Sequence, residues 1–221
     1  RAEPFGFDLS LIWTNTNTHY DKSEYHPAEG KPQQPKGYNA TLMTNQALEF
    51  MQETHDKPYF LMLSLNPPHA NFTDAPPDKR ALYPKGSLPY RPNVSLDNAS
   101  DDGHIAQKNQ SPHYEGYHAH ITAVDEELNR ALEAATASSR ETMVLYSSVH
   151  GSMFRSHGVG SKRQPFEESI RVPFMAWCPG RILAGTSSNA LFGSIDIMPT
   201  LCGLAGLPQP GSCMGQDFSG H

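Results

Sequence analysis

Three short apolar runs, each bounded by residues that end regular structure, limit most strongly how this chain can fold. They are residues 59–64, 143–147 and 171–177. Each run is too short for a typical helix and long enough for a strand, and an almost continuous apolar run of this length is typical of a strand buried on both faces. Residues 7–11 alternate apolar and polar side chains and predict one more short strand.

Two longer segments carry apolar residues at helical spacing and therefore predict helices. The first is residues 41–55, and the second contains an apolar stripe of Tyr117, Ile121, Val124, Leu128 and Leu132. Asp196 can cap a third, short helix that tolerates Pro199 in its first turn. Because helices and strands alternate along the chain, the pattern predicts an α/β fold with a mostly parallel sheet covered by helices.

Composition favours one folded domain over residues 1–221 and excludes several classes of protein. Hydrophobic residues make up 37% of the 221 residues, which is enough for one buried core. The formal net charge of -6 gives no support to nucleic-acid binding, which needs a clustered basic face. No apolar run reaches the roughly 18–20 residues that span a membrane. Cys178, Cys202 and Cys213 lack CxxC spacing, so we expect no zinc site, although Cys202 and Cys213 could pair in an oxidising compartment.

Histidines follow two of the predicted buried strands at the point where each strand ends. His69 comes shortly after residues 59–64, His150 follows residues 143–147, and Lys162 lies in the glycine-rich loop beyond His150. Ligands of open α/β sheets bind beyond the carboxyl ends of the strands. A lysine charge and two histidine donors would suit a sulfate or phosphate ester. The chain contains 11 histidines, however, and a histidine taken alone is more often a surface or supporting residue than a functional one, as a lone lysine is more often a solvated charge.

Short motifs spread along most of the chain resemble those of the sulfatase family, within the alkaline-phosphatase-like superfamily. The resemblance runs from Gly6 to Ser219 and rests on the occurrence of these motifs together, in family order. They are residues 60–64 with 67–69, 90–94, 124–125, 148–153, Lys162 with 166–174, 179–180, 196–201 and 204–206. The resemblance implies an alkaline-phosphatase-like fold, of which residues 1–221 would be the C-terminal-side portion of the catalytic domain.

The resemblance also implies a reaction and a role for each residue of the predicted site. It implies hydrolysis of a sulfate ester, with Ca²⁺ holding the sulfate against a formylglycine nucleophile. His69 matches the histidine that contacts the ester and protonates the leaving oxygen, and Lys162 matches the lysine that binds a sulfate oxygen. His150 matches the second position of a metal-binding pair. A sulfated small molecule or glycan is the implied partner, and the implied location is periplasmic, secreted or lysosomal.

Three departures separate this chain from the family pattern. Val149 occupies a position where the family usually has aspartate, and calcium affinity should fall sharply because calcium takes about six to eight oxygen ligands. The N-terminal strand with two aspartate ligands is not found, and neither is the nucleophile motif. Two segments approach that motif, residues 87–91 in a proline-rich stretch and residues 178–181 with the wrong spacing. We therefore expect a sulfatase fragment that is inactive alone.

Two other functions fit the same residues. A hydrolase of phosphate diesters or phosphonate esters would place the histidine and the lysine in the same way, because sulfate and phosphate are nearly isosteric. A non-catalytic homologue that binds sulfated glycans would account for Val149, because loss of a metal ligand is what a degenerate site shows. Whatever the function, a sheet without its first strands would have an unpaired edge and uncovered apolar surface, so we expect the isolated chain to be poorly soluble or partly unfolded.

Overall fold

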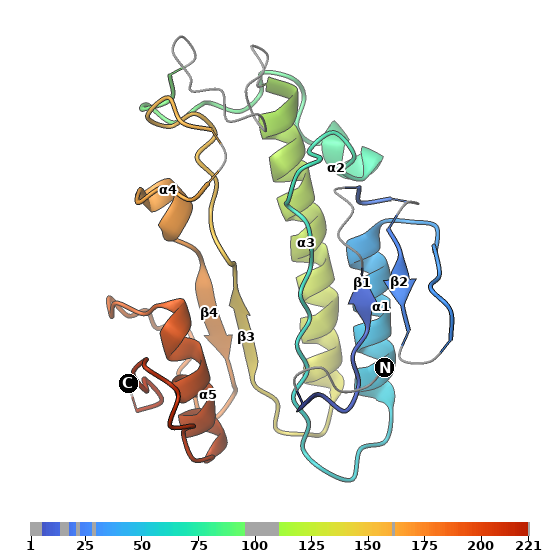
Figure 1. The fold of residues 1–221 in the computed structure, drawn as a ribbon, viewed down its shortest axis with the longest axis vertical. Helices are drawn as coiled ribbons and strands as arrows, with labels where there is room; N and C mark the ends of the chain where they lie inside the picture. The colour runs from blue at the N-terminus through green and yellow to red at the C-terminus, as the bar shows by residue number, and fades with distance from the viewer. Residues whose placement is uncertain are drawn as a thin grey trace.

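A long central helix organises the part of the chain that the structure describes. The computed structural model describes residues 6–13, 18–20, 23–27, 30–95, 111–160 and 162–220. Helix α3 (Ser111–Ala137) runs through the middle of the molecule, with α1 (Asn39–Gln52) along one side (Figure 1). Strands β3 (Val144–Ser147) and β4 (Phe174–Trp177) and helix α5 (Ile197–Ala205) lie on the other side. Both predicted long helices are thus confirmed, and α1 ends before Pro58.

Small side chains allow α1 and α3 to pack closely. Ala40, Thr44 and Ala47 of α1 are buried, and so are Ala119 and Ala123 of α3. Polar contacts lie beside them, because Thr41 Oγ1 donates to Glu127 and the Arg130 guanidinium donates to Asn45 and Glu127. The predicted stripe of α3 is therefore only partly right, since Val124 is buried but Ile121 is 40% exposed. Alanines at the contact shift the buried face of α3 away from its larger apolar residues.

The strands pair differently from the prediction. β3 and β4 form an antiparallel pair, in which Val144 lies opposite Trp177 and Ser147 lies opposite Phe174. β1 (Ile12–Trp13) and β2 (Tyr25–His26) form a second antiparallel pair, and residues 7–11 form no strand. Parallel pairing is thus not formed within the described residues. The two-residue β1 follows the stretch in which we predicted a strand.

Residues 59–64 are the clearest correction. We predicted a strand buried on both faces, but these residues have no assigned strand, and Phe60 and Met62 are 61% and 67% exposed. They run in the same direction as β3 alongside α3 (Figure 1), and Leu65 at their end packs against the cluster of Tyr38, Ala40 and Ala123. One face of the segment is therefore covered by the helices, while no strand of the described chain covers the other.

The remaining short elements connect these parts. α2 (Pro77–Ala81) packs on α3, and α4 (Glu167–Ile170) lies in the connection between β3 and β4. The 3-10 turn η2 (Ser194–Asp196) leads into α5, whose first turn contains the buried Pro199 as predicted. The carboxylate of Asp196 accepts from the backbone N–H groups of Gly193 and Gln216 and does not cap α5, which corrects that prediction.

The structure also bears on the expected disulfide bridge and on membrane-spanning helices. Cys178, Cys202 and Cys213 are all free thiols, so the bridge between Cys202 and Cys213 is not formed. Among the helices within the described ranges, none combines the length and the apolar character that crossing a bilayer requires.

Candidate functional site

His69 lies in the loop that follows residues 59–64. Its side chain is half-buried, and its Nδ1 lies 2.7 Å from the carbonyl oxygen of Ala70. A carbonyl oxygen can only accept, so Nδ1 carries the proton of the neutral ring and Nε2 carries the lone pair. The backbone N–H of His69 donates to Asn66 O at 3.1 Å. The histidine is therefore held in a defined tautomer by its own loop.

His150 has the same local arrangement at the carboxyl end of β3. Its Nδ1 lies 2.8 Å from the carbonyl oxygen of Gly151, so this ring also keeps its proton on Nδ1. The N–H of Gly151 donates to Ser169 O at 2.8 Å. Glycine is required there, since a Cβ at residue 151 would lie 2.2 Å from the carbonyl oxygen of Glu168. The loop of His150 is thus packed directly against the segment that contains α4.

Direct contacts join the three loops that carry His69, His150 and Lys162. The rings of Phe72 and Phe154, which follow the two histidines, lie 5.3 Å apart between centroids. Ser169 receives the N–H of Gly151 on its carbonyl oxygen and the N–H of Arg163, next to Lys162, on its Oγ. The sequence placed these residues at strand ends, and the structure connects their loops. Convergence of the three side chains on one anion stays a prediction.

The segment that we discounted as a nucleophile motif has a structural role. Arg91, its last residue, donates from Nη1 to the carbonyl oxygens of Ser152 and Met153 and to Ser156 Oγ, at 3.2, 3.3 and 3.1 Å. Asn93 Nδ2 donates to Glu168 at 2.6 Å. Residues 90–94 therefore fasten the loop beyond His150, and residues 88–95 form no helix, which agrees with the discounted assignment.

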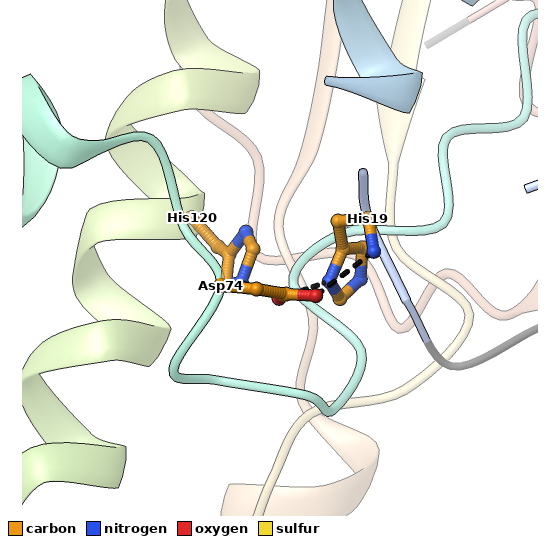
Figure 2. A group of neighbouring side chains, drawn as sticks. All are labelled: His19, Asp74 and His120. Carbon is orange, nitrogen blue, oxygen red and sulfur yellow. Dashed lines mark hydrogen bonds and ion pairs between the residues drawn. The ribbon is translucent and has the colours of Figure 1, made fainter. Parts of the chain in front are cut away.

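A cluster of His19, Asp74 and His120 was missed by the sequence analysis. Figure 2 shows the Asp74 carboxylate between the two imidazoles. Asp74 Oδ1 lies 2.7 Å from His19 Nδ1 and 3.4 Å from His120 Nε2, while Oδ2 accepts the backbone N–H of His19 at 2.9 Å. Both histidines are fully buried. The three residues come from separate segments of the chain, so no local motif announced them.

The hydrogen bonds of the cluster determine its tautomers. Tyr38 OH lies 2.7 Å from His120 Nδ1, and His120 Nε2 lies 3.0 Å from the carbonyl oxygen of Asn71. Because the carbonyl can only accept, His120 Nε2 carries the proton, and Tyr38 donates to Nδ1. Burial raises the pKa of Tyr38, which keeps this phenol protonated. Burial likewise lowers the pKa of His120, and its neutral form suits this arrangement.

The electrostatics of Asp74 follow from the same contacts. Partial burial alone would raise the pKa of this carboxyl group. Hydrogen bonds from His120 and from the ring and backbone of His19 outweigh burial and hold the pKa well below its ordinary value. Asp74 is therefore an ionised carboxylate that accepts hydrogen bonds from three donor groups.

The cluster offers three atoms that could hold a metal ion, all within 4.8 Å of one another. Two nitrogens and one carboxylate oxygen suit zinc better than calcium, which prefers oxygen. In this structure, however, His120 Nε2 uses its proton on Asn71 O and has no lone pair to offer a metal. His19 Nε2 is buried with no hydrogen-bond partner in the described chain, but it diverges from the carboxylate. The contacts describe a hydrogen-bonded cluster.

The calcium site implied by the resemblance does not fit the residues at positions 149 and 150. Val149 has no oxygen in its side chain and is 90% exposed. His150 supplies one ring nitrogen, which is a poor ligand for calcium. These two residues therefore cannot hold calcium between them.

Comparisons with known proteins agree with the motifs. A family model described as Sulfatase matches residues 3–207. An endo-4-O-sulfatase of Bacteroides thetaiotaomicron is 31% identical over 217 residues, which cover 92% of this chain and 40% of that protein. A solved structure from work on glycosaminoglycan metabolism by the same species is 28% identical, with a TM-score of 0.81, and covers 97% of this chain and 45% of that one.

A more distant solved structure, in complex with its substrate D-glucosamine-2-N,6-O-disulfate, shares the fold. It is 21% identical with a TM-score of 0.83, and covers 99% of this chain and 59% of that one. The chain thus spans about half the length of the relatives that it matches. These likenesses confirm the predicted α/β, alkaline-phosphatase-like fold class.

Proposed function

Because this chain belongs to the sulfatase family, we propose that the natural protein hydrolyses sulfate esters and that His69 and Lys162 act on the ester. The match of the sulfatase family model to residues 3–207 is the observation that carries the proposal. The joined loops of His69, His150 and Lys162 support it, because residues on connected loops can meet one tetrahedral anion.

Each of the two residues would have a distinct role. The ammonium group of Lys162 would bind a sulfate oxygen and offset the negative charge of the transferring group. His69, with its Nδ1 proton on Ala70 O, would donate a second proton from Nε2 when the ring is protonated. As the bond between sulfur and the ester oxygen breaks, that oxygen takes the proton and leaves as an alcohol. No residue of this chain is assigned as the nucleophile.

Sulfatases generally use a metal ion, and calcium is the ion that the resemblance implies. Since Val149 and His150 do not fit calcium, no step of the proposal runs through it. A chain that lacks the nucleophile motif should also not turn over by itself. We therefore expect no sulfate release from the isolated 221 residues.

The substrate class that we propose is a sulfated sugar. One relative is named an endo-4-O-sulfatase, and one solved relative holds a glucosamine disulfate. A periplasmic, secreted or lysosomal location accords with such substrates and stays a prediction. Hydrolysis of phosphate diesters or phosphonate esters is the alternative reaction, and a direct comparison of substrates separates the two.

Sulfate release by the natural protein tests the proposal. On sulfated disaccharides, His69→Ala should reduce kcat/KM by about 10²–10⁴-fold, the usual contribution of general acid catalysis. Lys162→Ala should also reduce kcat/KM. Lys31→Ala is the matched control, because Lys31 is exposed and its replacement should leave kcat/KM unchanged. Faster turnover of a phosphate diester than of any sulfate ester by the unmodified protein would contradict the proposal.

Val149 favours one further candidate, a non-catalytic protein that binds sulfated glycans. Its side chain is 90% exposed and contains no oxygen, so it cannot supply the oxygen ligand that the family usually has at this position. Glycan binding by the natural protein, without sulfate release at any calcium concentration, would support this candidate over the enzyme.

A further inference from the structure

We propose that His19, Asp74 and His120 are positioning residues that hold the loop of His69 in the geometry needed to protonate the leaving group. The inference rests on the proposed function, because it assigns these residues to the work of His69. The three side chains connect residues 18–20, the loop of residues 69–75 and helix α3, which are distant in sequence.

The first link runs from His120 to the backbone just beyond His69. His120 Nε2 donates to the carbonyl oxygen of Asn71 at 3.0 Å. The adjacent peptide unit, between Ala70 and Asn71, contains the carbonyl that accepts the Nδ1 proton of His69 at 2.7 Å. The two peptide units share the Cα atom of Asn71, so a rotation at Asn71 would move the acceptor of His69. His120 therefore restrains the tautomer and the ring orientation of His69 through two hydrogen bonds.

The second link fixes the far end of the same loop. Asp74 accepts from the backbone N–H and from the ring of His19, at 2.9 and 2.7 Å. Tyr38 OH, bonded to His120 Nδ1, orients the ring that donates to the loop. Every hydrogen bond in this set includes a buried or partly buried partner, which makes each one costly to break.

Packing between these two links limits the remaining freedom of the loop. Phe72 is 7% exposed, and its ring lies 5.7 Å from that of Tyr117 and 5.3 Å from that of Phe154. The backbone of α3 approaches so closely that a Cβ on Gly116 would lie 1.8 Å from the carbonyl oxygen of Phe72. Asn71, Phe72 and Asp74 are thus held almost consecutively, and His69 lies two residues before the first of them.

Leaving-group dependence separates positioning from a general structural role. An activated aryl sulfate such as 4-nitrophenyl sulfate releases a stable anion and needs little protonation, whereas a sugar alcohol needs a proton. In the natural protein, His120→Leu should reduce kcat on a sulfated disaccharide by about 10²-fold, the loss expected for a misplaced catalytic group. The reduction on 4-nitrophenyl sulfate should be at least about ten times smaller, as for His69→Ala.

A conservative variant and a spectroscopic measurement complete the test. His120→Gln, whose amide can donate to Asn71 O, should recover most of the loss. Nitrogen NMR of the His69 ring should show the proton on Nδ1 in the natural protein and a mixture of tautomers in His120→Leu, whatever the activity. If His120→Leu does not fold, Asp74→Asn, whose side chain is partly exposed, serves the same two measurements.

The outcomes distinguish this inference from the proposed function. Equal losses on both sulfates in His120→Leu, with the expected selective loss in His69→Ala, would overturn the inference and leave the function standing. If His69→Ala does not lose more activity on the disaccharide than on 4-nitrophenyl sulfate, the proposed role of His69 in sulfate ester hydrolysis is rejected. The NMR measurement would then still decide whether His120 positions the ring of His69. One equivalent of zinc in the natural protein, lost in His120→Leu, would assign the cluster to a metal instead.

Discussion

Replacing Phe154 by alanine removes the ring that joins the loop of His150 to the loop of His69. Phe154 is 1% exposed and its ring contacts those of Phe72, Tyr114 and Tyr117, at centroid distances of 5.3, 5.3 and 4.7 Å. Burial of about 175 Å² of such a side chain, at about 25 cal/mol per Å², stabilises the fold by about 4 kcal/mol. That value agrees with the range of about 3–5 kcal/mol for this kind of replacement.

Urea-induced unfolding of the natural protein, followed by circular dichroism, measures this change. Leu191→Ala is the control, since Leu191 is 95% exposed and its loss should change the free energy of unfolding by less than about 0.5 kcal/mol. A cycle with Phe72→Ala should show a coupling of about 0.5–1.5 kcal/mol, because the two rings are in contact. A change below about 1 kcal/mol in Phe154→Ala, or strict additivity in the cycle, would refute the argument that these rings join the loops.

Three further predictions follow from single residues. In the natural protein, Val149→Asp should restore calcium binding, measured by calorimetry, at little cost in stability because the position is exposed; no recovery would favour a protein that only binds glycans. Gly151→Ala should reduce both stability and sulfate release, because its Cβ would meet Glu168 O at 2.2 Å, whereas Gly211→Ala, with open space around it, should change neither. Asp74 has a folded pKa below its ordinary 3.8, so its contribution to stability is present above about pH 4 and is lost as the pH falls below that value. Urea midpoints should therefore drop less steeply on acidification in Asp74→Asn, and identical slopes would count against the described contacts.

Local patterns were sufficient to predict the two long helices and the strands β3 and β4. Apolar spacing located α1 and α3, and apolar runs located β3 and β4, because each pattern reflects contacts within one element. Pairing direction was not predictable in this way. The run at residues 59–64 has the composition of a doubly covered strand, yet in the described chain Phe60 and Met62 are exposed. Composition indicates what a segment can bury and does not indicate which neighbour covers it.

Only the part of the candidate site that local sequence patterns report could be predicted. His69 and His150 follow short apolar runs, and position at a strand end is visible in one stretch of sequence. His19 lies 55 residues from Asp74, and His120 lies 49 residues from Asn71. No spacing rule connects such pairs, since their contact depends on where α3 places its buried face. Only the three-dimensional arrangement revealed that His120 donates to the carbonyl oxygen of Asn71 and that His19 bonds to Asp74 in the same loop.

The packing of both histidine loops against α3 has an evolutionary consequence. Helix α3 contacts the His69 loop through His120 and Gly116. The same helix contacts the His150 loop through Tyr117, whose ring packs on that of Phe154. The sequences of surface loops can then change during evolution to bind different sugars, while α3 keeps the relative position of the His69 and His150 rings constant. Substitutions on the buried side of α3 should consequently be selected against as strictly as those at the two histidines themselves.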